Sequence, residues 1–242
     1  MHRLKQIKSL YCLCLLFIAP CVNAMETVVG SGQQARETRP VANISEVFVS
    51  GSGTLYLKQG GEESLEVESD DNLMPYILTR VENGKLSIEM KNGSFQTKLG
   101  FNYYLTVRTL GAIETSGSVN IHGDELSAQT IYIQIHGSSK MRLRSLYAQT
   151  ARLLVDGAGI LEIEKGSTKK QMLHLSGAGI MDLLGVQNES TELAVHGASR
   201  AELEVLRELN VQVSGSGSVR YRGKPKITQT IMGAGKLVAL GN

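Results

Sequence analysis

A short glycine motif divides most of this sequence into repeats of nearly constant length. The motif is a small or polar residue, Gly, then Ser or Ala, and it interrupts strand-like runs at eight points. Its first glycines are Gly51, Gly117, Gly137, Gly157, Gly177, Gly197, Gly215 and Gly233. From Gly117 to Gly197 the spacing is constant, and each of the last two intervals is two positions shorter. Such a period predicts a solenoid, in which each repeat buries its apolar side only by stacking on its neighbours.

The residues around each glycine indicate which side chains face the interior. The residue two positions before it is aliphatic in seven of eight repeats, and the residue four positions after it is apolar in all eight. Apolar and polar residues alternate around these anchors, which predicts strands with one buried and one solvated face. Each repeat is therefore expected to run strand, glycine corner, strand and return loop, because glycine accepts a positive φ that other residues resist.

These features predict an all-β fold, a single-stranded, parallel β-helix-like solenoid. We expect it to be right-handed, with coils of about 20 residues stacked about 4.8 Å apart. The shortening of the last two repeats is expected in the return loop. The reason is that losing one strand residue would move every following side chain to the opposite face.

The period lapses before Gly117, so residues 44–115 are expected to form an irregular first half and residues 116–242 the regular repeats. Alternation in the first half predicts strands at residues 46–50, 54–58, 64–68, 85–91 and 102–109. Residues 70–81 are expected to form one short helix, interrupted near Pro75. We expect this half to cap the open end of the coil within one domain, residues 44–242.

The first 24 residues have the composition of a secretory signal peptide. Arg3, Lys5 and Lys8 give a basic start, an apolar run follows, and Val22-Asn23-Ala24 ends it with small residues. All three cysteines fall inside this segment, so the cleaved chain would hold no disulfide and would depend on its core and backbone pairing. Residues 25–43 are polar and predict a leader strand or linker.

The net charge of the cleaved chain limits which classes of binding partner are expected. Cleavage would remove three of the 25 basic side chains and none of the 23 acidic ones, which leaves a net charge of 25 − 3 − 23 = −1. A nearly neutral chain has no basic footprint, so nucleic acid is not an expected partner. No later segment is expected to cross a membrane as a helix.

The order of short motifs along the chain resembles the head GIN domain family of autotransporter adhesins, secreted bacterial proteins, over about residues 28–242. The matching motifs are Gly30-Ser31-Gly32, Glu37, Arg39, Val41, Ile44, Val47, Val49, Ser50-Gly51-Ser52-Gly53, Asp71-Asn72-Leu73, Gly84-Lys85-Leu86 and the later corners. The resemblance implies a coil akin to the pectin-lyase type, without recognised catalytic residues, and a role in adhesion.

An acidic patch is the one specific site that the repeat register predicts. The outward positions after the corners carry, in successive coils, Glu162, Glu164, Asp182, Glu202 and Glu204, bordered by arginines. One interpretation is a solvated face whose borders form ion pairs, Arg142 with Glu162 and Arg220 with Glu202. The other is a site for a cation such as Ca²⁺ or for a basic partner, because calcium prefers clustered oxygen ligands. The patch lacks the loop of a dedicated calcium motif, and no other cofactor is predicted.

Serine, histidine and aspartate also occupy one column on consecutive coils. Ser116, His136 and Asp156 stand just before their corners, and together they have the side chains of a hydrolase triad. The sequence offers neither a nucleophile elbow nor an oxyanion donor set, so we expect at most a His136–Asp156 pair across one rung.

The histidines and aromatic residues are the remaining candidates for binding. His122, His136, His174 and His196 stand in different columns or distant coils, so no shared metal ion is predicted. The chain has no Trp, and Tyr103-Tyr104 beside Phe101 is the only aromatic cluster, which suits a core as well as a ligand site.

The sequence therefore predicts a non-enzymatic, exported binding module of the cell envelope or surface, with adhesion as one role. Its ligand would be a surface glycan or protein, and its location the periplasm, the outer-membrane surface or the extracellular space. Two alternatives stay open: a polysaccharide-acting enzyme on a coiled parallel scaffold, and a structural or assembly protein that uses its end coils. Self-association is also left open.

Overall fold

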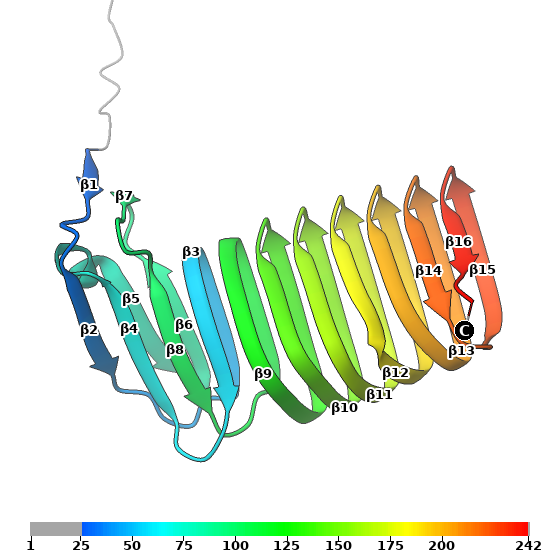
Figure 1. The fold of residues 1–242 in the computed structure, drawn as a ribbon, viewed down its shortest axis with the longest axis horizontal. Coiled ribbons are helices and arrows are strands. Elements are labelled where there is room, and N and C mark those ends of the chain that lie inside the picture. The colour runs from blue at the N-terminus through cyan, green and yellow to red at the C-terminus, as the bar shows by residue number, and fades with distance from the viewer. Residues whose placement is uncertain (1–25, 242) are drawn as a thin grey trace, which may run out of the picture.

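The computed structural model describes residues 26–241, which form an elongated β-solenoid (Figure 1). The predicted signal peptide, residues 1–24, lies outside the described residues. Five long strands bend round to form successive coils and pair in parallel: β9 (Ala112–Gly137), β10 (Lys140–Gly157), β11 (Ile160–Gly177), β12 (Ile180–Gly197) and β13 (Arg200–Gly215). Beyond β13, β14 (Ser218–Arg222) stacks on the first part of β13 and β15 (Lys226–Gly233) on its second part. β16 (Lys236–Ala239) stacks on β14, and β15 and β16 together form the last coil. The predicted solenoid is confirmed.

The glycine corners line one long edge of the solenoid, opposite the bends of the strands (Figure 1). The first glycine of all eight corners has a positive φ, between 83° and 112°. At Gly177, with φ 88°, a Cβ would also lie 2.7 Å from the carbonyl oxygen of Gly157 in the preceding coil. The same oxygen accepts a hydrogen bond of 2.9 Å from the Ala178 N–H. Glycine is therefore required both by the backbone conformation and by the close stacking of the corners.

Aliphatic columns form most of the interior, as the alternation predicts, with buried polar side chains such as Gln171 and Thr191 among them. Leu175 and Val195 are register partners in adjacent coils, and both are 0% exposed. The other predicted inward anchors are also buried until the last coil, where Ile231 and Leu237 are only partly buried. The apolar contact between coils is thus repeated along the whole regular part.

The first of the two shortened repeats loses its residues at the bend in the middle of β13, opposite Leu183–Ser190 of β12. The two strands pair from Ile180 to Leu183 and again from Ser190 to Gly197, with register irregularities between these segments. Both arms of the coil therefore keep their inward and outward faces, which is the physical reason for a deletion between the strands. The predicted return loop is itself extended backbone within the long strand.

The first half is irregular, but its helix is shorter than the sequence predicts. Only η1 (Asp71–Tyr76) is helical, a 3-10 turn that contains Pro75 and buries Leu73 and Met74. The rest of the predicted helix is strand β5 (Ile77–Glu82), which pairs antiparallel with β6 (Lys85–Met90). Proline removes a helical donor, and the two-residue turn Asn83-Gly84, with positive φ at both positions, favours a hairpin.

The remaining strands of the first half extend the stack in mixed directions. β3 (Glu46–Gln59) passes through its corner without a break and pairs in parallel with β9 and with β8 (Asn102–Val107). β4 (Ser64–Asp70) is antiparallel to β8, and β2 (Gln34–Arg39) is antiparallel to β4. β1 (Thr27–Val29) pairs with β7 (Ser94–Gln96), so part of the polar leader pairs with strands of the first half.

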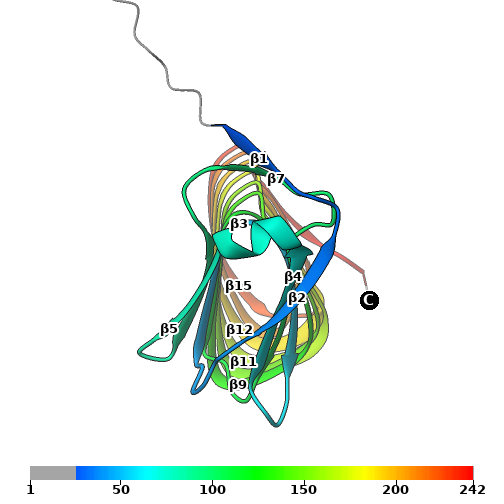
Figure 2. The same ribbon diagram turned by 90° about the vertical axis from the view of Figure 1, so that its left-hand side faces the viewer.

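The N-terminal end of the coil is covered. Figure 2 shows η1 lying across this end. Its buried side chains, Leu73 and Met74, belong to the core. No helix within residues 26–241 is long and apolar enough to cross a membrane.

Candidate functional site

One outward-facing column of side chains runs along most of the solenoid, because the strands stack in register. We call it the outward column. Its members, from the N-terminal end, are Glu66, Tyr104, Tyr56, His122, Arg142, Glu162, Asp182, Glu202 and Arg220. The part from His122 to Arg220 has the predicted register. The N-terminal members come from strands outside the regular repeat.

Three rings form an aromatic stack at the N-terminal end of the outward column. The ring centroids of Tyr104 and Tyr56 are 4.9 Å apart with planes 9° from parallel, and those of Tyr56 and His122 are 5.8 Å apart at 22°. The Arg36 guanidinium lies 4.7 Å from the Tyr104 centroid and pairs with Glu66 at 2.7 Å. These spacings are close to the distance between neighbouring strands, so the sheet register itself holds the rings in place.

The aromatic stack forms one side of a surface groove of about 450 Å³. The opposite side carries Lys58, Thr106 and Asp124, each two residues further along the strand from a ring of the stack. The groove therefore runs across the strands, along the axis of the solenoid. Tyr56 is 41% exposed, so a large part of its ring is accessible. Partial burial and, after it, the Glu68 carboxylate raise the pKa of Tyr104.

The predicted acidic patch is bordered by ion pairs. Glu162, Asp182 and Glu202 occupy successive positions of the outward column, as expected. Arg142 hydrogen-bonds Glu162, and Arg220 Nη1 lies 2.8 Å from Glu202 Oε1. Desolvation acts to raise the pKa of Glu162, but hydrogen bonds from Arg142 and Lys140 outweigh it and lower that pKa. Both predicted cross-rung ion pairs are confirmed.

The second acidic column, predicted to run through Glu164 and Glu204, is not aligned as expected. Glu204 pairs with Gln187, whose amide donates to Glu204 Oε1 at 3.3 Å, because the irregularity at the β12 bend displaces the register. Within residues 26–241, no group of three or more His, Cys, Asp and Glu side chains is placed to hold a metal ion. This geometry favours the solvated, ion-paired face, and calcium binding stays a prediction.

The corner column forms the single cross-rung pair that the sequence predicts. His136 Nδ1 lies 3.8 Å from Asp156 Oδ2, and both side chains are substantially exposed. An open, solvated pair of this kind lacks the buried and oriented aspartate that a hydrolase triad uses.

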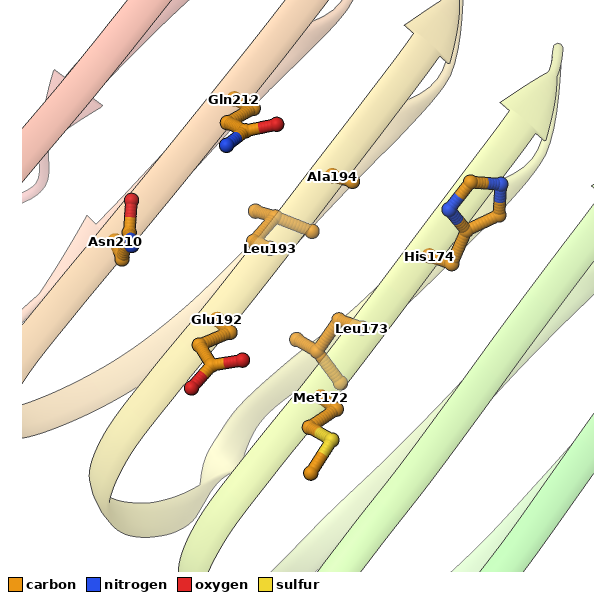
Figure 3. Close-up of a pocket in the computed structure, with 8 residues that line it drawn as sticks. All are labelled: Met172, Leu173, His174, Glu192, Leu193, Ala194, Asn210 and Gln212. Carbon is orange, nitrogen blue, oxygen red and sulfur yellow. The ribbon is translucent and has the colours of Figure 1, made fainter.

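A second hollow, which we call the notch, lies on the other arm of the coil, over β11, β12 and β13 (Figure 3). His174, Ala194 and Gln212 are consecutive register partners, and the small alanine leaves a gap between two larger side chains. The notch has a volume of about 300 Å³ and is flanked by Met172, Leu173, Glu192, Leu193 and Asn210. His174 also neighbours His196, at 5.3 Å between ring centroids, a proximity that the sequence does not predict.

The aromatic stack is the main feature that sequence reasoning misses. Alternation along β8 buries Tyr103 and turns Tyr104 outward, so the predicted Tyr103-Tyr104 cluster divides between core and surface. Burial raises the pKa of Tyr103 well above its ordinary value. Tyr56 meets Tyr104 only because β3 and β8 pair. One signal was available: Tyr56 stands five residues after Gly51, as His122 stands five residues after Gly117.

Comparison with known proteins agrees with this architecture. Residues 43–225 match the family described as putative auto-transporter adhesin, head GIN domain. The chain belongs to this family. No curated protein matches the head GIN chain.

Several solved structures have the same fold as the head GIN chain. A putative adhesin from Bacteroides fragilis has a TM-score of 0.83 at 20% identity, over 88% of this chain and 100% of its own. A putative lipid binding protein from Parabacteroides distasonis has a TM-score of 0.71 at 19% identity, over 89% and 100%. A putative adhesin from the same species has a TM-score of 0.68 at 24% identity, again over 89% and 100%. At these identities the similarity to solved structures concerns the fold alone. The family itself is one of adhesin-like surface binding proteins.

The Gly30-Ser31-Gly32 motif, which precedes the residues matched to the family, has a structural reason. A Cβ on Gly30 would lie 2.5 Å from Cγ of Asp70, which is fully buried. Asp70 accepts hydrogen bonds from the Gly32 N–H at 2.7 Å, the Thr97 hydroxyl at 2.6 Å and the Lys98 N–H at 3.0 Å. Desolvation acts to raise the pKa of Asp70, but these bonds and one from the Leu99 N–H lower it to about 2.

Proposed function

We propose that this head GIN protein is an exported, non-enzymatic binding module of the bacterial cell envelope, which captures a surface glycan or protein ligand in the groove beside the aromatic stack. Residues 1–24 would be the cleaved signal peptide, and the folded chain would act in the periplasm, on the outer-membrane surface or outside the cell. Adhesion is the role that this binding would serve.

The observation that carries the proposal is the aromatic stack. Tyrosine combines apolar area with a hydroxyl that can hydrogen-bond, and its few rotatable bonds limit the entropy lost on binding. Stacking between Arg36, Tyr104 and Tyr56 restricts these side chains further, so the groove is ordered before a ligand arrives. Its volume, about 450 Å³, falls within the range of small-ligand sites.

The lining of the groove supports a ligand rich in hydroxyl groups. Thr38, Ser64 and Thr106 supply hydroxyls, while Glu66, Asp124 and Lys58 supply charged donors and acceptors. Since the groove runs across the strands, an extended chain could contact several rungs at once. Many weak polar contacts of this kind, beside a few aromatic anchors, suit glycan or peptide binding better than a buried reaction centre.

A binding role is also supported by the solvent exposure of the side chains that could otherwise act as acids or bases. The exposed His136–Asp156 pair and the ion-paired acidic patch are open to solvent, whereas general acids and bases need tuned, positioned groups near a substrate. The family to which the chain belongs is described by adhesion, and one relative in fold is described as a lipid binding protein. A hydroxyl-rich, charged groove favours a glycan or protein over an acyl chain.

A binding screen of the chain without residues 1–24 tests this function. Glycan and matrix-protein panels should yield at least one ligand, and Tyr56→Ala and Tyr104→Ala should each weaken its binding at least tenfold. Tyr147→Ala is the matched control, because Tyr147 is 39% exposed and lies outside the groove. It should leave the affinity unchanged.

Three outcomes would reject the proposal. Binding that survives both groove variants would place the ligand elsewhere on the solenoid. Turnover of any polysaccharide in a parallel hydrolase and lyase panel would support the enzymatic alternative instead. A screen without any ligand would leave the structural role as the better account.

A further inference from the structure

His174 and His196 come from neighbouring coils and lie side by side on the outer surface. His174 pairs in register with Ala194, and His196 pairs with Ser176, so the two histidines are diagonal neighbours on β11 and β12. Their ring centroids are 5.3 Å apart and their planes differ by 46°. His174 is half-buried beside the notch and His196 is exposed, so both rings can be reached from solvent.

We propose that this pair binds a late first-row transition-metal ion, Cu²⁺, Ni²⁺ or Zn²⁺, with two imidazole ligands and its remaining positions open. Imidazole is a preferred ligand of these ions. Two rings that bind one tetrahedral ion at 2.0–2.1 Å per nitrogen would place their centroids about 5 Å apart. The observed separation, 5.3 Å, matches that requirement. In the proposed site, each ring would turn so that one of its nitrogens points at the ion.

The neighbouring side chains leave room for the open positions. Ala194, next to His174 in the register, has no polar atom in its side chain and opens the notch beside the ring (Figure 3). Glu192, the carboxylate that lines the notch, pairs with Lys170 at 2.8 Å and is therefore already engaged. Water, or a donor atom of a molecule in the notch, would complete the coordination. The site is independent of the aromatic stack and does not rest on the proposed function.

The proposed site has two ligands from the protein and is not a complete metal centre. Within residues 26–241 no cluster of three or more ligating side chains exists, and a two-ligand site is weaker than a structural zinc site. Among the three ions, Cu²⁺ should bind most tightly, following the usual order of affinity for nitrogen ligands.

Titration of the tag-free chain without residues 1–24 with Cu²⁺, Ni²⁺ and Zn²⁺ tests the site. Calorimetry should give one ion per chain at micromolar affinity for Cu²⁺, and the His174 and His196 ring resonances should shift or broaden. His174→Gln and His196→Gln should each weaken binding at least tenfold. His136→Gln is the matched control, since that histidine belongs to a different coil and pairs with Asp156.

Two results would overturn the proposed metal site. Binding that His174→Gln and His196→Gln leave intact, or that only His136→Gln removes, would overturn the assignment. An affinity no tighter than millimolar for all three ions would do the same. Both variants replace surface side chains, so their melting temperatures without metal should equal that of the wild type, which separates loss of a ligand from loss of the fold.

Discussion

The two halves of this solenoid close their cores in different ways. In the regular part, from β9 to β16, each coil presents the same inward aliphatic positions, and each interacts only with its neighbours. In the first half, the core is closed by contacts that occur once: η1 with Leu73 and Met74, and the hydrogen bonds to Asp70. In the regular part the same apolar contacts recur in every coil. In the first half, closure of the core depends on a few residues whose contacts occur once.

The two ends of the coil show the consequence. At the N-terminal end η1 covers the aliphatic columns, and Leu73 is fully buried. In the last coil the same columns are only partly covered: Ile231 and Leu237 are half-buried where Val213 and Val219, one coil earlier, are buried. An inward residue therefore contributes fully only when coils flank it on both sides. This difference can be measured residue by residue.

The largest effect is expected from Leu175→Ala in the middle of the regular part. Leu175 is 0% exposed and has a buried register partner, Val195, in the next coil. A buried leucine truncated to alanine typically costs about 2–5 kcal/mol, because apolar contacts are lost and a cavity remains. Leu237→Ala, in the half-covered last coil, should cost less than about 1 kcal/mol. Urea unfolding of both variants measures the difference, and equal losses would contradict the comparison between flanked and terminal coils.

Gly177→Val should have the next largest effect, on the corner rather than the core. The substitution forces a β-branched residue into φ 88° and places its Cβ 2.7 Å from the Gly157 oxygen. We expect a loss of at least about 1–3 kcal/mol, the cost of a strained backbone position. Gly61→Ala is the control, since a Cβ there meets no atom within 4 Å. If Gly177→Val melted at the temperature of the wild type, the corners would not require glycine.

The regular half could be predicted from the sequence because its physical rules repeat. One glycine spacing fixes the corner, and one alternation then fixes which side chains are buried in every coil, as Leu175 and Val195 illustrate. An atypical residue in one repeat does not mislead the prediction, because the other repeats show the same pattern. For the same reason the ion pairs of Arg142 with Glu162 and of Arg220 with Glu202 could be predicted from spacing alone.

The first half could be predicted less well, because its pairings are not repeated. Residues 77–82 join a hairpin that Pro75 and Asn83-Gly84 determine locally, although the sequence pattern predicts a helix there. Tyr104 joins Tyr56 through a pairing between strands that are distant in the sequence. The displaced Glu204 has a similar cause, since a bulge at one bend breaks a register that spacing alone would extend. The candidate groove thus lies where the regular and the irregular strands meet, and periodicity carries no information there.

Acid should weaken the first half before the regular half, through Asp70. Its pKa in the folded chain is lowered to about 2 from an ordinary value of 3.8. Because the pKa of this carboxyl group is lower in the folded chain than in the unfolded chain, the group stabilises the fold at a pH above its unfolded pKa. This stabilisation is lost as the pH falls from about 4 to about 2. The protection of the Lys98 and Leu99 amides from hydrogen exchange, relative to the intrinsic exchange rate at each pH, should fall across this range before that of Leu175. Asp70→Asn should show this loss of protection already at neutral pH, whereas Asp156→Asn, an exposed carboxylate of the regular half, should not.

The smallest effect is expected in the acidic patch, where the regular half places like charges in one column. Asp182 lies between Glu162 and Glu202 in the register, and those two carboxylates are engaged by Arg142 and Arg220. Asp182→Asn removes repulsion without breaking these ion pairs, so it should change stability by no more than about 0.5 kcal/mol, in the stabilising direction. Millimolar Ca²⁺ should then shift the melting temperatures of the wild type and of Asp182→Asn equally, because the bordering carboxylates already have partners. A larger calcium shift in the wild type would restore the alternative interpretation, in which the column gathers a cation that binds the folded state and stabilises it by mass action.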